Sequence, residues 1–283
     1  MSGTNGYASA NVLVSTDWAL QHLKEKDLRF VEVDVDTKQF DEGHIEGAVG
    51  WNWQTQLQDQ VRRDILDNEQ IAAFLGASGI RPDTTIILYG DHNNWFAAYA
   101  FWLLKYYGHK DVRLMNGGRK KWKAEGKPLT KVVASVSKNT YAVSQPVSDL
   151  RATREYVARI LNDGKEGLVD VRSADEFTGK VIAPAGMSET AQRGGHIPGA
   201  RNIPWSMAVN EDGTFKTAEE LKELYEDRGI TAKLKEVVTY CRIGERSSHS
   251  WFVLKYLLGY PNVRNYDGSW TEWGNLIGAP IER

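Results

Sequence analysis

The second half of the sequence repeats segments of the first half in the same order. The strand-like run F-V-E-V-D-V at 30–35 returns as L-V-D-V-R at 168–172, and the motif G-H-I occurs at 43–45 and again at 195–197. The chain has 283 residues, which is longer than most single domains. We therefore expect two copies of one domain.

Each copy alternates short strand-like runs with segments of helical periodicity. The runs at 84–89 and 237–240 are apolar, as expected for buried parallel strands, and each precedes a polar loop and a helix-like segment. This alternation indicates an α/β fold in which a mainly parallel sheet is flanked by helices. The stretch at 127–147 contains two prolines and many Ser and Thr residues, as is typical of a linker. We predict a first domain at 10–128, a linker at 129–147 and a second domain at 148–283.

The composition is that of a globular protein without special partners. The net charge is −2 and the pI is about 6.3, so no global basic field favours nucleic acid or an anionic membrane. The single cysteine cannot form an internal disulfide bond. No apolar run reaches the length of a transmembrane helix, and no signal peptide is visible. We expect a cytoplasmic protein, and the sequence does not indicate its oligomeric state.

The only cysteine lies in a loop that has the features of a reactive site. Residues 240–250 read Y-C-R-I-G-E-R-S-S-H-S, between a strand candidate and a helix-like segment. Cys241 thus follows the carboxyl end of a strand, where α/β sheets bind ligands, and precedes a helix amino terminus whose N–H groups attract anions. Arg242 and Arg246 add positive charge. These surroundings should stabilise a thiolate, whereas an inert buried thiol would have apolar neighbours.

This loop resembles the active-site loop of the rhodaneses, sulfurtransferases that carry sulfur as a cysteine persulfide. Their C-x-x-G-x-R-S pattern is filled here by Cys241, Gly244, Arg246 and Ser247. The paired G-H-I motifs resemble those of two-domain members, so the resemblance covers nearly the whole chain. It implies tandem rhodanese-like domains and a catalytic Cys241. The loop residues expected to cradle the persulfide are Ile243, Gly244, Glu245 and Ser247.

Differences between the copies point to residues that bind substrate. Cys241 aligns with Gly90 or Asp91, so the first copy lacks a nucleophile. Arg172 aligns with Asp36, and an acid at that position would repel an anionic substrate. We therefore predict that Arg172 binds substrate. The first domain is expected to be catalytically inactive and to close one side of the active cleft.

Other charged residues have less distinctive settings. Arg193 precedes the second G-H-I motif and resembles a family arginine at that place, which implies that it binds substrate together with Arg242 and Arg246. A solvated surface charge is an equally open interpretation of Arg193. His44 and His196 occupy equivalent positions in both copies, so a scaffold role is the better interpretation for both.

The predicted activity is the transfer of sulfur from thiosulfate to cyanide or a thiol. The arginines would attract the thiosulfate dianion, and the Cys241 thiolate would take its outer sulfur as a persulfide. 3-Mercaptopyruvate remains open as the donor, because Ile243 replaces a basic residue often found in thiosulfate enzymes and Glu245 adds a negative charge. A cysteine phosphatase needs C-x5-R, whereas Cys241 and Arg246 are spaced as C-x4-R. A tandem module that only binds partners is the non-enzymatic alternative, which the presence of Cys241 disfavours.

Neither a cofactor nor a metal site is predicted. The six histidines and one cysteine show no H-E-x-x-H motif and no paired C-x-x-C spacing. The glycine-rich motifs that bind nucleotides are also absent from the sequence. The expected partners are a small-molecule sulfur donor, thiosulfate, and a thiophilic acceptor, with no nucleic acid and no membrane.

Overall fold

The computed structural model describes residues 5–161, 165–182 and 191–283, and the chain divides into two compact units. The first unit contains 11–147 and 211–215, and the second contains 148–210, 216–283 and the described residues before 11. A short segment from the second half therefore belongs to the first unit, where Lys121 Nζ contacts Asp212 Oδ2 at 2.8 Å. Part of the insertion that precedes the second G-H-I motif, 183–190, lies outside the described residues.

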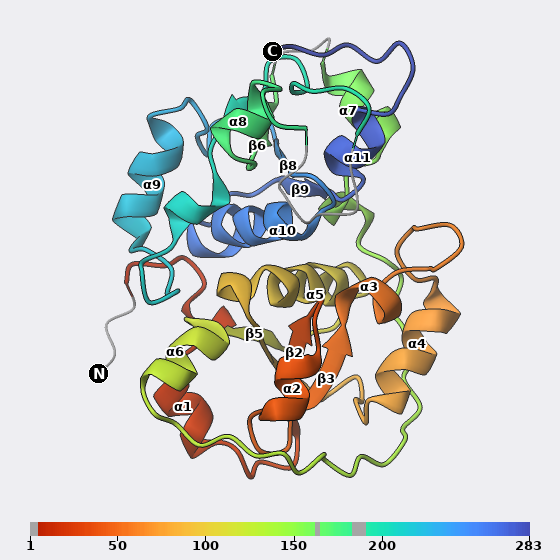
Figure 1. The fold of residues 1–283 in the computed structure, drawn as a ribbon, viewed down its shortest axis with the longest axis vertical. Coiled ribbons are helices and arrows are strands. Elements are labelled where there is room, and N and C mark those ends of the chain that lie inside the picture. Colours follow the sequence, from red (N-terminus) through yellow and green to blue (C-terminus); the bar gives the residue numbers. More distant parts are fainter. Residues whose placement is uncertain (1–4, 162–164, 183–190) are drawn as a thin grey trace. The chain divides into compact units, whose positions relative to one another are not determined.

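The first unit is built on a five-stranded parallel sheet (Figure 1). Each pairing in it is parallel, and most residues of the central strands are buried, as expected when both faces of a sheet are covered. In spatial order the strands are β1 (Leu13–Val14), β5 (Val112–Met115), β4 (Thr85–Tyr89), β2 (Leu28–Asp34) and β3 (Val49–Asn52).

Helices flank this sheet. Helix α5 (Trp95–Tyr106) packs against β2, β4 and β5, and its residues from Phe96 to Leu104 are all buried. Helices α1 (Thr16–Gln21) and α6 (Gly118–Ala124) contribute Ala19 and Trp122 to a core cluster with Phe30 and Ile87 of the strands. The first unit also contains α2 (Lys38–Glu42), α3 (Trp53–Gln56) and α4 (Asn68–Ala77).

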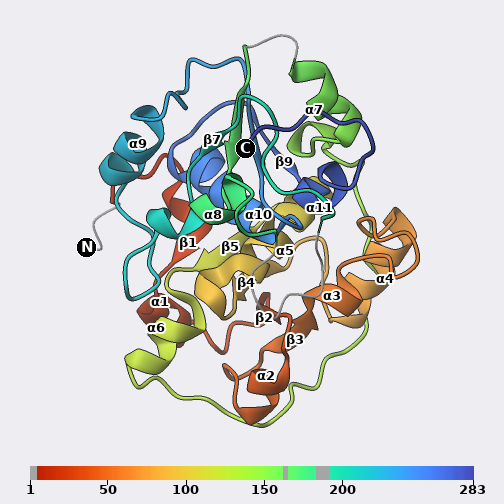
Figure 2. The same ribbon diagram turned by 45° about the horizontal axis from the view of Figure 1, so that its top comes forward.

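The second unit has a four-stranded parallel sheet with the order β7 (Arg201–Asn202), β6 (Gly167–Asp170), β8 (Val237–Tyr240) and β9 (Val263–Tyr266). Helix α10 (Glu245–Phe252) packs against β8 and β9. Helices α7 (Arg154–Ile160) and α11 (Ser269–Trp273) lie side by side (Figure 2) and share a core cluster. Two further helices are α8 (Ala174–Phe177) and α9 (Ala218–Glu226). Within the described ranges, no helix has the length and apolar character needed to cross a bilayer.

The sequence repeat appears as equivalent contacts in the two units. Tyr89 at the end of β4 accepts a hydrogen bond through its hydroxyl from the backbone N–H of Ile45, at 3.1 Å. Tyr240 at the end of β8 accepts the same bond from Ile197, also at 3.1 Å. Each bond ties the end of a central strand to a G-H-I motif. The tandem α/β prediction is confirmed.

The two histidines of the G-H-I motifs support the scaffold. The ring nitrogens of His44 lie 2.8 Å from the Phe40 carbonyl oxygen and 3.1 Å from that of Val132. His196 Nδ1 lies 2.9 Å from the Phe177 carbonyl oxygen. Each imidazole also stacks on the phenylalanine that it contacts. These contacts confirm the predicted scaffold role.

The first unit buries an acidic cluster near the end of β2. Arg119 Nη1 contacts both oxygens of Glu32, at 2.8 and 2.9 Å. Asp34 Oδ1 accepts the backbone N–H of Asp91 at 2.8 Å. Burial raises the pKa of Asp34 to about 8. The Asp91 and Glu32 carboxylates raise this pKa further, whereas the hydrogen bond from the Asp91 amide and the charge of Arg119 lower it. Asp34 is therefore protonated at neutral pH.

Through Asp34, the free energy of unfolding should fall as the pH rises from about 4 to about 8. The unfolded chain releases this proton near pH 4, whereas the folded chain keeps it, so the loss is at most about 1.4 kcal/mol per pH unit. The Asp34→Asn side chain cannot ionise. The free energy of unfolding of this variant, relative to that of the wild type, should therefore rise by up to that amount for each pH unit. Urea unfolding across this pH range measures the difference, with exposed Asp36→Asn as the control. Parallel curves for wild type and Asp34→Asn would contradict the assignment.

Candidate active site

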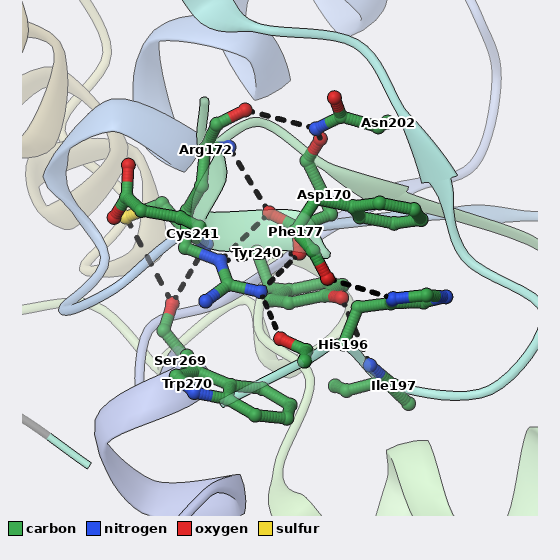
Figure 3. Close-up of polar contacts among 12 residues, drawn as sticks. Asp170, Arg172, Phe177, His196, Ile197, Asn202, Tyr240, Cys241, Ser269 and Trp270 are labelled. Atoms are coloured by element: carbon green, nitrogen blue, oxygen red, sulfur yellow. Dashed lines mark hydrogen bonds and ion pairs between the residues drawn. The ribbon is translucent and has the colours of Figure 1, made fainter. Parts of the chain in front are cut away.

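The cysteine loop connects β8 to α10 at the carboxyl end of a central strand (Figure 3). Cys241 follows Tyr240, the last residue of the strand. The backbone N–H of Trp270 donates to the Cys241 carbonyl at 3.1 Å, and that of Thr271 donates to the Arg242 carbonyl at 3.0 Å. The first turn of α11 therefore binds two loop carbonyls and fixes the loop in place.

Gly244 directs a backbone amide at the sulfur. Its N–H donates to Cys241 Sγ at 3.1 Å. Its φ of 106° suits glycine, and a Cβ there would come within 3.0 Å of the Asp267 carbonyl oxygen. The Gly244 carbonyl accepts hydrogen bonds from the hydroxyls of Ser247 and Ser248, at 2.9 and 2.8 Å. Gly244 is thus held through both its N–H and its carbonyl, with the N–H facing the sulfur.

The Cys241 side chain is fully buried, yet its neighbours are polar. Its Sγ lies 3.6 Å from Glu245 Oε2. Burial raises the pKa of the thiol and the Glu245 carboxylate raises it further, while Arg246 and the amides of Ser247 and Gly244 lower it. The net pKa is above that of an ordinary cysteine. Contrary to the predicted stabilisation of a thiolate, burial and the neighbouring acid outweigh the positive groups and raise the pKa of Cys241.

A buried acid holds Arg246 in place. Its Nη1 and Nη2 each lie 3.0 Å from an oxygen of Glu176, which is on α8. Burial raises the pKa of Glu176, but the bonds and charge of Arg246 more than offset this and leave that pKa below its ordinary value. Glu176 also accepts the backbone N–H of Ser173, at 3.1 Å, in a capping box. The S-x-x-E pattern signals this cap but not the contact with Arg246.

Arg172 is part of the scaffold. Its Nε and Nη2 contact Asp170, with the closest approach at 2.5 Å, and Nη2 also donates to the Gly195 carbonyl at 2.7 Å. The guanidinium lies over the Trp270 ring at 4.7 Å (Figure 3). The side chain is almost completely buried in these contacts. This geometry argues against the predicted contact of Arg172 with substrate.

The first unit has an equivalent buried arginine from another position in the chain. Arg119 pairs with Glu32 and donates to the Gly43 carbonyl at 2.5 Å, as Arg172 does to Gly195. Both units thus place one guanidinium between an acid of a central strand and the glycine of a G-H-I motif. The sequence alignment pairs Arg172 with Asp36 and does not reveal that Arg119 is its structural equivalent, because the two arginines lie in different segments of their units.

Arg193 also has a structural setting. Its three guanidinium nitrogens donate to backbone carbonyls at the end of α11 and just after it, at 2.6 to 3.1 Å. The four acceptors are Trp273, Gly274, Leu276 and Ala279. These bonds tie the segment before the second G-H-I motif to the end of the chain. They favour a scaffold role over substrate binding and over a solvated charge.

The position equivalent to Cys241 in the first unit is Gly90. Gly90 and Cys241 each directly follow the tyrosine whose hydroxyl is hydrogen-bonded to a G-H-I motif. Of the two residues that could align with Cys241, Gly90 and Asp91, the structure therefore selects Gly90. A Cβ at Gly90 would lie 2.4 Å from the Val33 carbonyl oxygen, so no side chain fits without a shift of the backbone. The Gly90 N–H donates to Asn94 Oδ1 at 3.0 Å. The Gly90 amide is therefore already hydrogen-bonded to a side chain of the segment that follows it.

The second unit thus combines a cysteine sulfur with an amide donor and a buried arginine. Such a site can attack an electrophilic atom of an anionic substrate and hold an anionic product. In the part of the chain that the structure describes, no group of three or more His, Cys, Asp and Glu side chains is placed to bind a metal ion.

Comparisons with known proteins agree with this geometry. The rhodanese-like domain matches residues 15–125 and 153–276. A Haloferax volcanii protein named "Putative thiosulfate sulfurtransferase" is 53% identical and covers 99% of this chain and 99% of its own length. "Sulfur carrier protein TtuD" of Thermus thermophilus is 56% identical over 98% of this chain and 99% of that protein.

Among solved structures, EanB with a cysteine persulfide, in a tetrahedral intermediate state with ergothioneine, superimposes with a TM-score of 0.84. The identity is 26%, over 98% of this chain and 71% of that chain. Because two domain matches and full-length relatives agree with the fold, we conclude that this chain belongs to the rhodanese family and has two rhodanese-like domains.

Proposed function

We propose that this protein is a thiosulfate sulfurtransferase that passes sulfane sulfur to cyanide or a thiol through a Cys241 persulfide. The observation that carries this proposal is the hydrogen bond from the Gly244 amide to Cys241 Sγ, 3.1 Å long, at the end of β8. The name of the Haloferax relative supports the donor. The persulfide in the EanB structure supports the intermediate.

The reaction divides one sulfur transfer into two displacements at sulfur. Cys241 attacks the outer sulfur of thiosulfate, and sulfite departs with the electron pair of the broken S–S bond. The Gly244 amide then lies beside the new persulfide, where a hydrogen-bond donor stabilises negative charge. An acceptor nucleophile next removes the terminal sulfur and restores Cys241. Covalent storage lets donor and acceptor react in turn.

Arg246 and Arg242 supply the positive charge for the donor. Arg246 is within electrostatic reach of the sulfur and lowers the pKa of Cys241. Arg242 adjoins Cys241 and is also buried. We assign Arg172 and Arg193 to the scaffold, because their guanidinium groups are engaged with Asp170 and with backbone carbonyls. The first domain is proposed to be inactive, since Gly90 leaves no room for a nucleophilic side chain.

The physiological acceptor is proposed to be a thiol, with cyanide as its laboratory substitute. The Thermus relative is named as a sulfur carrier, which favours onward transfer of the bound sulfur to another protein. A protein thiolate attacks the terminal sulfur by the same displacement as cyanide. The proposed chemistry at Cys241 is therefore the same for both acceptors.

Treatment with thiosulfate should add one sulfur atom, about 32 Da, to Cys241 of the purified protein. Cyanide should then remove that mass and release thiocyanate. Cys241→Ser should show neither the adduct nor thiocyanate formation. Intact-protein and peptide mass spectrometry locate the adduct, and a parallel assay with 3-mercaptopyruvate ranks the donors. Thiocyanate formation by Cys241→Ser at the wild-type rate would refute the proposal.

Arg246→Lys should lower kcat/KM for thiosulfate by about 100-fold, because lysine keeps the charge but loses the two-pronged contact with Glu176. Steady-state kinetics measure the loss, and thermal unfolding establishes that the variant is folded at the assay temperature. Arg154→Lys is the matched control, since Arg154 is an exposed arginine paired with Glu155 on α7. A folded Arg246→Lys with unchanged kcat/KM would remove Arg246 from the proposed site.

A further inference from the structure

Glu245 places a second acid against the reactive sulfur. It is the first residue of α10, its side chain is buried, and Oε2 lies 3.6 Å from Cys241 Sγ. Two acidic groups this close in a buried site cannot both be ionised, so they titrate as a pair. The pair of Cys241 and Glu245 therefore retains at least one proton at neutral pH.

The surrounding cations do not allow Cys241 and Glu245 to be ionised at the same time. Both terminal nitrogens of Arg246 are engaged with Glu176, which leaves Nε at 3.8 Å from Glu245 Oε1. Arg242, from the loop, is the other cation that acts on Glu245. Burial raises the pKa of Glu245, and Arg246 and Arg242 offset only part of that rise. A carboxyl with a raised pKa can accept a proton from a neighbouring thiol.

Two other polar side chains of the second unit are poorer acceptors for the thiol proton. Ser269 Oγ lies 4.0 Å from Cys241 Sγ, but it donates its hydrogen to the Tyr266 carbonyl at 2.7 Å and accepts the Cys241 backbone N–H. Burial lowers the pKa of His249 to about 3, so its ring is a neutral and weak base. Among the described residues, Glu245 is thus the carboxyl placed against the sulfur.

We propose that Glu245 accepts the Cys241 thiol proton during sulfur transfer and returns it at the end of the cycle. The proton moves from Sγ to a carboxylate oxygen, which leaves a thiolate beside a neutral acid without a change in net charge. The thiolate forms a bond to the outer sulfur of thiosulfate, and sulfite leaves with the electron pair of the broken bond. Glu245 keeps the proton beside the anionic terminal sulfur of the persulfide.

The second displacement returns the proton. Cyanide or a thiolate bonds to the terminal sulfur, the electron pair of the persulfide bond returns to Sγ, and Glu245 donates its proton to that sulfur. Protonation of Glu245 also removes a negative charge while the thiosulfate dianion is bound. This explains how a loop that attracts an anion tolerates a buried acid. The inference depends on the proposed function, and its test separates the two.

The rate of sulfite release in a single turnover, measured against pH, tests the proton transfer. In the wild type the rate should be independent of pH between the two apparent pKa values of the pair, because the proton only moves within it. In Glu245→Gln the thiol must lose its proton to water, so the rate should rise about tenfold per pH unit up to the thiol pKa. Glu245→Asp should restore a flat region at a lower rate. Identical profile shapes for the wild type and Glu245→Gln would overturn the inference.

A second measurement uses only the wild-type protein, so it does not depend on the folding of a variant. Loading the wild type with sulfur should produce the infrared carbonyl band of a protonated carboxyl group in the difference spectrum. The absence of this band would also overturn the inference. If the wild type takes no sulfur from thiosulfate, the proposed function itself fails. If it takes sulfur but the pH profiles coincide, only the role of Glu245 fails.

Discussion

The backbone conformation of Gly244 is the constraint on which the site depends. Its amide can face Cys241 Sγ only because the backbone adopts a positive φ, which suits glycine and which a side chain near Asp267 would oppose. Two serine hydroxyls hold the Gly244 carbonyl, and the first turn of α11 holds the carbonyls of Cys241 and Arg242. The loop is therefore organised before any ligand binds, which is what electrostatic stabilisation of a developing anion requires.

The duplicated fold repeats one scaffold around two different loops. In both units a tyrosine at the end of a central strand binds the G-H-I motif, and a buried arginine binds the carbonyl of its glycine. The units differ in the next residue, Cys241 in one and Gly90 in the other. Because Gly90 packs against the Val33 carbonyl, replacing it with cysteine would require the backbone to move. The loop at Gly90 thus differs from the loop at Cys241 in packing as well as in sequence.

Much of the fold and the place of Cys241 at the end of a central strand could be predicted from the sequence. Repeated motifs set the order of strands and helices, and the loop pattern identified Cys241 and Gly244. Side-chain direction cannot be read in this way: alignment with Asp36 predicts a substrate contact for Arg172, whereas its guanidinium pairs with Asp170. Burial was also inaccessible, and it reverses the expected shift in the pKa of Cys241. Glu176 contacts Arg246 from a distant segment, and its local pattern signals only a helix cap.

In the proposed cycle, a sulfur atom stays on Cys241 between two separate displacements. Sulfite released after mixing with thiosulfate, in the absence of any acceptor, tests this claim most directly. We predict a rapid burst of one sulfite for each chain, followed by no further release until cyanide is added. Continuous release without an acceptor, or no burst while thiocyanate still forms when both substrates are present, would contradict a stored persulfide.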